Sequence, residues 1–321
     1  MTPEERKKYR LIFMGTPDFA VESLKALHEA GYTICAVLTT PDKPAGRGRK
    51  LQECPVKKYA HENNMLVIAP EKLRDSDAIH EIQNLNADLG VVVAFKKLPE
   101  EIYTAPRLGT FNLHGSLLPA YRGAAPIHRA VMNGETKSGV TTFLLNDKID
   151  EGGIFYREEV EIGENTTTAE LYEQLMKIGA QLVVKTADDY LEGRIESVPQ
   201  PESSQQKNAP KIFRDDCRID WTKPINDIHN HIRGLSTYPG AFTEMIAPRN
   251  QSIKILKSRI VNKEANFAIK ETRHLIEKNS WKVQLPDGLL EIIEVQPQGK
   301  PPMPAAAFIN GLPKEEDVKL N

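Results

Sequence analysis

Cysteine is scarce in this chain, and long apolar runs are missing. The three cysteines, Cys35, Cys54 and Cys217, are too few and too far apart for a disulfide framework or a zinc site. No stretch approaches the roughly 20 apolar residues that a membrane-spanning helix needs. The first ten residues, MTPEERKKYR, are charged and unlike a secretory signal. We therefore expect a cytoplasmic protein without a membrane segment.

Four common site motifs are also absent. The segment GTPDFA follows the first strand-like run but lacks the G-x-G-x-x-G pattern of a dinucleotide site. Neither the nucleotide P-loop G-x-x-x-x-G-K-[ST] nor the nucleophile elbow G-x-S-x-G occurs. No His, Cys and carboxylate residues are spaced as metal ligands are, so we expect no metal.

The first half of the chain alternates strand and helix patterns, which is typical of an open, doubly wound α/β sheet. In the first helix pattern, Thr16 is the expected N-cap and Pro17 the first helical residue. Expected strands cover residues 10–15, 32–40, 65–69, 88–95, 109–114, 139–146 and 153–162, and the longest expected helix follows them.

The pattern of expected secondary structure changes after a polar stretch at 197–211, which we interpret as a linker. We expect a catalytic domain over 1–196 and a second domain over 212–321. Extended patterns dominate the second domain, and Pro286-Asp287-Gly288 between two of them predicts a hairpin. This domain is expected to be a small β-barrel or sandwich.

Charge is unevenly distributed. The net charge is −2, but residues from Lys207 onward hold 18 lysines and arginines against 14 acidic residues. A basic C-terminal part favours a polyanionic partner, while random scatter of surface charge explains it equally well.

The segment FNLHGSLLPAYRGAAP at 111–126 is the first candidate site. Alternate residues of a strand share one face, so Asn112 and His114 point the same way. They lie where an apolar strand ends, and strand ends of this kind line the ligand crevice of open α/β sheets. An amide beside an imidazole can stabilise an oxyanion and move a proton. The alternative is a structural pair satisfied by loop backbone.

Two polar loops are further candidates. Asp150, beside Gly152 and Gly153, could hold a histidine in its useful tautomer, whereas Asp147 and Glu151 are more simply exposed turn residues. The segment 41–58 is rich in basic residues, and its glycines and prolines predict irregular structure. It could clamp phosphates, or it could be a solvated charged loop.

At these residues the chain resembles the methionyl-tRNA formyltransferase family. The matching segments include FMGTPDFA, PDKPAGRGRKL, FNLHGSLLPAYRGAAPI, GVTTFLLNDKIDEGG and APKIFRDDCRIDW. The resemblance covers nearly the whole chain. It implies a Rossmann-like formyltransferase domain followed by an OB-like barrel, and a monomer.

The resemblance also implies an activity and its residues. The expected reaction transfers a formyl group from 10-formyltetrahydrofolate to the amino group of methionine on initiator tRNA. By position, the catalytic residues would be Asn112, His114 and Asp150. The segment that contacts folate would comprise Ser116, Leu117, Leu118 and Pro119. The loop that binds tRNA would contain Lys43, Arg47, Arg49 and Lys50. Lys96 and Lys97 depart from the family pattern in a segment near the pterin pocket.

Two other functions stay open on the sequence. A formyltransferase or hydrolase of the same fold could act on a small amine such as a sugar nucleotide or glycinamide ribonucleotide, although the basic loop would then have no obvious role. A non-catalytic RNA-binding protein is the more distant alternative.

Overall fold

A computed structural model describes residues 1–45, 50–202, 207–248, 250–263, 272–277, 279–313 and 319–320. The chain forms two compact units that alternate along the sequence. Unit 1 comprises residues 1–123, 139–160 and 172–208, and unit 2 comprises 124–138, 161–171 and 209–321. The domain boundaries expected at 196 and 212 stay predictions.

Unit 1 contains a seven-stranded sheet in the order β10-β9-β7-β6-β1-β2-β5. The pairs β1–β2, β1–β6, β6–β7 and β2–β5 are parallel, and β7–β9 is antiparallel. The predicted α/β class is therefore confirmed. The strands are β1 (Arg10–Gly15), β2 (Thr33–Leu38), β5 (Val67–Ile68), β6 (Leu89–Val93), β7 (Thr110–His114), β9 (Lys137–Leu144) and β10 (Ile154–Glu161).

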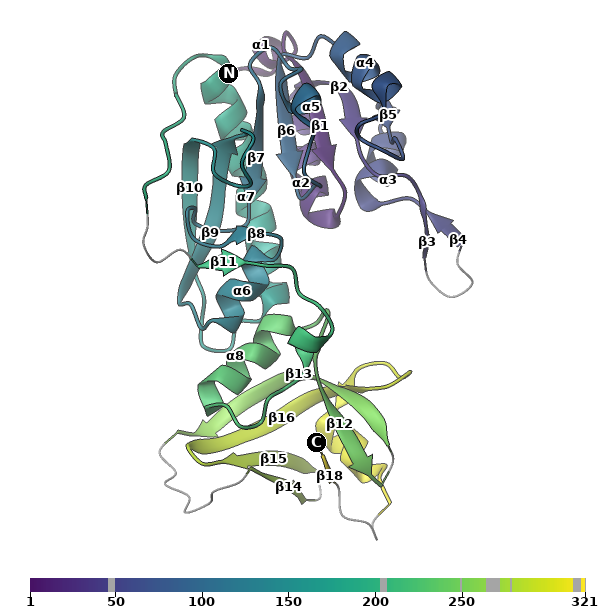
Figure 1. Ribbon diagram of the computed structural model, residues 1–321, viewed down its shortest axis with the longest axis vertical. Helices are drawn as coiled ribbons and strands as arrows, with labels where there is room; N and C mark the ends of the chain where they lie inside the picture. Colours follow the sequence, from purple (N-terminus) through teal and green to yellow (C-terminus); the bar gives the residue numbers. More distant parts are fainter. Residues whose placement is uncertain are drawn as a thin grey trace. The chain divides into compact units, whose positions relative to one another are not determined.

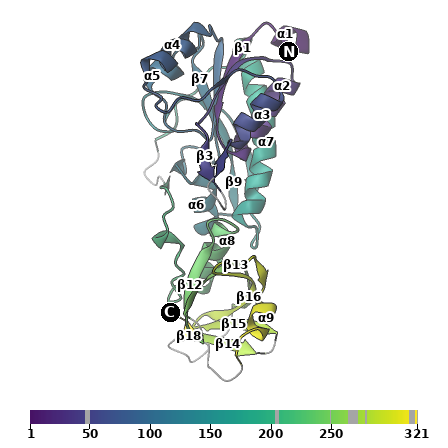
Figure 2. The same ribbon diagram turned by 90° about the vertical axis from the view of Figure 1, so that its right-hand side faces the viewer.

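Helices cover both faces of this sheet (Figure 2). On one face, Ile12 and Met14 of β1 pack with Ile82 of α4 and Ile102 of α5 in a buried cluster. Helices α2, α3 and α7 lie on the other face. The helices are α1 (Pro3–Arg6), α2 (Asp18–Glu29), α3 (Pro55–Glu62), α4 (Ser76–Asn84), α5 (Glu100–Tyr103) and α7 (Thr168–Leu191).

Two details of unit 1 differ from expectation. Helix α2 starts at Asp18 because Pro17 is extended and occupies the N-cap position, so the prediction of Thr16 as N-cap was wrong. The Asp18 carboxylate and the Tyr172 hydroxyl accept from the Phe19 N–H instead. The segment 41–58 is not wholly irregular, because β3 (Lys43–Ala45) and β4 (Lys50–Gln52) pair as antiparallel strands (Figure 1).

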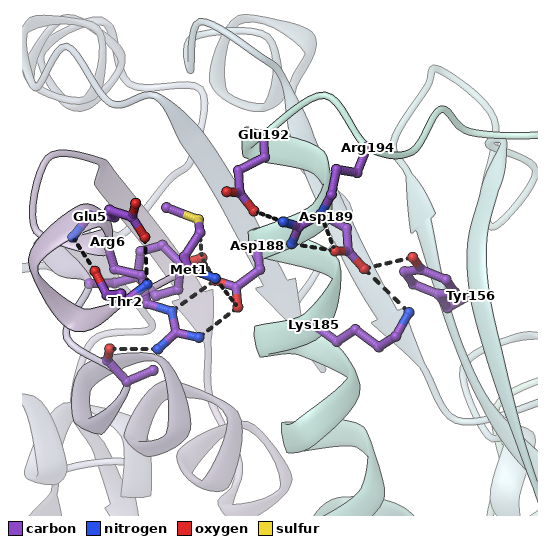
Figure 3. Close-up of polar contacts among 12 residues, drawn as sticks. Met1, Thr2, Glu5, Arg6, Tyr156, Lys185, Asp188, Asp189, Glu192 and Arg194 are labelled. Atoms are coloured by element: carbon purple, nitrogen blue, oxygen red, sulfur yellow. Dashed lines mark hydrogen bonds and ion pairs between the residues drawn. The ribbon is translucent and has the colours of Figure 1, made fainter.

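Two adjacent carboxylates of α7 tie the helix to different parts of unit 1 (Figure 3). Asp188 accepts from the Arg6 guanidinium at 2.6 and 2.8 Å and from the Tyr32 hydroxyl at 2.6 Å. Burial would raise the pKa of Asp188, but these donors outweigh it and lower the pKa. Asp189 accepts from the Tyr156 hydroxyl of β10 at 2.7 Å. Helix α7 thereby holds the edge strand β10 as well as α1 and the residue that precedes β2.

Unit 2 is built on an antiparallel sheet in the order β14-β15-β16-β13-β12-β18, which confirms the predicted β domain. The predicted hairpin joins β15 to β16, and the Asp287 carboxylate in its turn accepts from the Ile225 N–H at the start of α8. Trp281 and Ile255 pack with Ile232 of α8 in the core.

The elements of unit 2 are α6 (Pro126–Met132), η1 (Asp215–Cys217), α8 (Ile225–Leu235), β12 (Ala241–Ala247), β13 (Gln251–Asn262), β14 (Arg273–Glu277), β15 (Ser280–Leu285), β16 (Gly288–Pro297), β17 (Met303–Pro304), α9 (Ala305–Asn310) and β18 (Lys319–Leu320). Two short strands, β8 (Arg122–Gly123) and β11 (Asn208–Ala209), lie where the chain passes between the units.

Candidate active site

The candidate site lies at the carboxyl end of β7, between β6 and β9. Asn112 and His114 are two residues apart in this strand and so share one face. Asn112 pairs with Val92 of β6 and Phe143 of β9, which fixes its position in the sheet. His114 is only 6% exposed. The structure thus places both predicted residues at the end of a central strand.

The His114 ring is held by loop backbone and faces a carboxylate. Its Nε2 lies 2.8 Å from the carbonyl oxygen of Tyr121. A carbonyl can only accept, so Nε2 carries the proton of this bond. Nδ1 is 3.8 Å from Oδ2 of Asp150, which is too long for a direct hydrogen bond. The ring nitrogen left for chemistry is therefore Nδ1, the one beside the carboxylate.

Asp150 lies in the loop between β9 and β10 in a left-handed conformation, with φ of 55°. Its Oδ2 accepts from the Gly123 N–H at 2.9 Å. Two residues later the loop passes so close to β9 that a Cβ on Gly152 would lie 1.6 Å from the Leu144 carbonyl oxygen. Glycine is required there, and this close approach helps to set the position of Asp150.

The tripeptide Tyr121-Arg122-Gly123 organises the site. The Tyr121 carbonyl holds His114, and the Gly123 N–H holds Asp150. Between them, Arg122 donates to Oε1 of Gln200 from Nε at 3.1 Å and from Nη2 at 2.6 Å. Sequence reasoning did not predict Arg122 or Gln200 as site residues. The tripeptide was visible next to the predicted site, but no local signal pointed to Gln200.

Asn112 carries a buried polar atom without a partner. Its Oδ1 accepts no hydrogen bond from any described residue. Leaving such an atom unpaired costs about 1–3 kcal/mol, so the site is suited to a ligand that brings an N–H or O–H donor. The amide nitrogen of the same side chain can donate to a developing negative charge. Asn112 can therefore contact both partners of an acyl transfer.

The four residues predicted to contact folate divide into two kinds. The Ser116 hydroxyl donates to the Ala120 carbonyl at 2.6 Å, and Leu118 is 1% exposed in a core cluster. These two hold the turn in shape. Leu117 and Pro119 are half-buried and keep some exposed surface. Contact of this segment with folate stays a prediction.

Two of the four predicted tRNA-binding residues belong to the paired strands β3 and β4. Lys43 is exposed at the start of β3. Lys50 begins β4, although its side chain lies outside the described residues, as do Arg47 and Arg49. Lys96 and Lys97 are both exposed, and Lys97 Nζ donates to the Asp147 carbonyl at 3.3 Å. Lys97 therefore contacts the loop that carries Asp150.

The described parts of the chain offer neither a metal site nor a membrane span. They contain no group of three or more His, Cys, Asp and Glu residues that could hold a metal ion. Within the same ranges, none of the helices has the length and apolar character needed to cross a bilayer.

Comparison with known proteins defines the class. Residues 8–187 match the family model "Formyl transferase", and residues 211–313 match "Formyl transferase, C-terminal domain". An N-formyltransferase from Helicobacter canadensis, solved with folinic acid and dTDP-3-aminofucose, has the same fold. Its TM-score is 0.65 at 21% identity, with 88% of this chain and 98% of that chain covered. Fold and family models together define a formyl transferase.

Two curated relatives narrow the class. A methionyl-tRNA formyltransferase of Bacteroides fragilis is 42% identical over 98% of this chain and 99% of its own length. One of Porphyromonas gingivalis is 43% identical over 98% of this chain and 99% of its own length. The chain belongs to the methionyl-tRNA formyltransferase family.

Proposed function

We propose that this enzyme transfers the formyl group of 10-formyltetrahydrofolate to the α-amino group of methionyl initiator tRNA. The observation that carries the proposal is the similarity to methionyl-tRNA formyltransferases along the full length of both chains. The arrangement of Asn112, His114 and Asp150 at the end of β7 supports formyl transfer as the chemistry.

In the proposed reaction, a bond forms between the methionine nitrogen and the formyl carbon, and the bond from that carbon to N10 of the folate breaks. The formyl-folate supplies the activated formyl group. Asn112 Nδ2 donates to the formyl oxygen as negative charge develops on it, and Asn112 Oδ1 accepts from the attacking amine.

In this mechanism, His114 and Asp150 serve the transfer of a proton from the amine to N10 of the folate. The amine loses a proton as the new bond forms, and N10 gains one as it leaves. Nδ1 of His114 is the nitrogen placed to take and return that proton, because Nε2 is committed to Tyr121. The Asp150 carboxylate, with Oδ2 3.8 Å from Nδ1, is the group of opposite charge that faces the imidazolium formed between the two transfers.

The test of the chemistry is formyl transfer to charged initiator methionyl-tRNA by wild type and Asn112→Ala. Loss of one oxyanion donor costs about 10²- to 10³-fold in kcat, and we expect a fall of that size. Asn84→Ala, at an exposed position in the last turn of α4, is the matched control and should behave as wild type. Near-normal kcat in Asn112→Ala would remove Asn112 from the mechanism.

We further propose that the basic segment around Lys43, Arg47, Arg49 and Lys50 binds the tRNA backbone near the acceptor end. Arg47→Ala should then lower formylation of tRNA far more than it lowers the slow background hydrolysis of the formyl-folate. Equal losses in both reactions would assign the segment to the shared site instead. The alternative of a small substrate is tested by offering a nucleotide-sugar amine in competition with charged initiator tRNA. Preferential formylation of the nucleotide sugar would favour that alternative.

A further inference from the structure

Gln200 joins two parts of unit 1 that are far apart in the sequence. Its Nε2 donates to the carbonyl oxygens of Asp150 at 2.8 Å and Gly152 at 2.9 Å, while its Oε1 accepts from Arg122. The side chain thus bridges the loop that carries the catalytic carboxylate and the tripeptide that orients His114. It contacts none of the groups proposed to react.

The chemistry of the partners permits only one orientation of the Gln200 amide. A guanidinium has donors and no acceptor, and a peptide carbonyl has acceptors and no donor. The amide oxygen must therefore face Arg122, and the amide NH₂ must face the two carbonyls. Arg122 is itself held on its other side, where Nη1 lies 3.3 Å from Oε1 of Glu151. Each member of this chain of contacts orients the next.

The bridge acts where the backbone needs support. Asp150 has φ of 55°, in the left-handed region that side chains other than glycine adopt only at a cost in free energy. The two hydrogen bonds from Gln200 hold the carbonyl groups of Asp150 and Gly152, at and just after that left-handed position. A cavity of about 440 Å³, lined by Arg122, Glu151 and Gln200 among others, adjoins the bridge. If the side chain is shortened, water from this cavity can take the place of the amide. The two carbonyls would then no longer be tied to Arg122, and the loop would lose its fixed position.

We infer that Gln200 is a positioning residue for catalysis, which acts by holding the Asp150 loop at the distance from His114 that the proton transfer requires. The inference rests on the proposed function. A displacement of about 1 Å in a catalytic group can cost on the order of 100-fold in rate. Gln200→Ala should therefore lower kcat about 10- to 100-fold, with the KM values for methionyl-tRNA and formyl-folate within twofold of wild type.

A double-mutant cycle with Asp150→Ala separates positioning from general stability. If Gln200 acts through Asp150, adding Gln200→Ala to Asp150→Ala should change kcat less than twofold, because the group being positioned is already gone. The same factor in both backgrounds would overturn the inference, as would a change in KM alone. Gln83→Ala, on the exposed face of α4, is the control and should leave all constants unchanged.

A second variant and a second readout keep the test independent of folding and turnover. Gln200→Glu keeps the volume and the contact with Arg122 but places an acceptor against two carbonyls, and it should lose at least as much kcat as the alanine variant. In the free protein, the Gly123 amide, bonded to Asp150, should exchange its hydrogen faster in both variants. Unchanged exchange with normal kcat refutes positioning, whereas a wild type that fails to formylate methionyl-tRNA refutes the proposed function instead.

Discussion

Replacing Thr141 by valine tests how the turn before the site is held. Thr141 is fully buried in β9, and its hydroxyl donates to the Ser116 carbonyl at 2.6 Å and accepts from the Leu118 N–H at 3.1 Å. Valine has nearly the same shape, so the core stays filled while both backbone groups lose their partner. Each unpaired buried group costs about 1–3 kcal/mol, so the two together give an expected destabilisation of about 2–6 kcal/mol.

The same substitution should affect the folate step selectively. Ser116 and Leu118 belong to the segment predicted to contact the formyl donor, so a loosened turn should raise the KM for formyl-folate several-fold and leave the KM for methionyl-tRNA unchanged. Urea unfolding measures the stability change, and initial rates with each substrate varied in turn measure the KM values.

The neighbouring residue provides a matched control. Thr142 is equally buried but bonds to the Thr186 hydroxyl of α7 at 2.8 Å, away from the turn. Thr142→Val removes one side-chain hydrogen bond at a cost of about 1 kcal/mol and should leave both KM values unchanged. A Thr141→Val protein with wild-type stability and an unchanged KM for formyl-folate would refute the reasoning about the turn.

Three further outcomes are expected. Gly152→Ala should lower kcat more than about tenfold, because its Cβ would lie 1.6 Å from the Leu144 carbonyl oxygen and displace the Asp150 loop; a normal kcat in steady-state assays would contradict this. Burial lowers the pKa of His274 to about 4, whereas the pKa of a histidine in the unfolded chain is about 6.5. As pH drops from about 6.5 to 4, the unfolded chain binds this proton and the folded chain does not, so the free energy of unfolding should fall by about 3 kcal/mol. Urea melts across this range should show a smaller fall for His274→Asn, and an equal fall in both proteins would exclude His274 as the cause. The logarithm of the association constant for tRNA should decrease linearly with the logarithm of salt concentration, and anisotropy titrations that show no salt dependence would exclude backbone contacts.

Much of the fold could be predicted because its signals are local. Apolar runs and the alternation of strand and helix patterns depend on residues next to each other, and they predicted the parallel sheet of unit 1. The hairpin at Pro286-Asp287 was predictable for the same reason. The start of α2 was predicted one residue too early, since whether Pro17 joins a helix or precedes it depends on the contacts that Asp18 and Tyr172 offer.

In the candidate site, too, some features followed from the sequence and others only from the tertiary structure. That Asn112 and His114 share a face follows from strand geometry alone, and Asp150 was identified by its motif. Sequence did not determine which nitrogen of His114 is left for chemistry, nor that Gln200 supports the loop of Asp150 from 50 residues away. Periodicity is a property of neighbouring residues, whereas a hydrogen-bond partner is selected by distances and angles that exist only once the chain has folded.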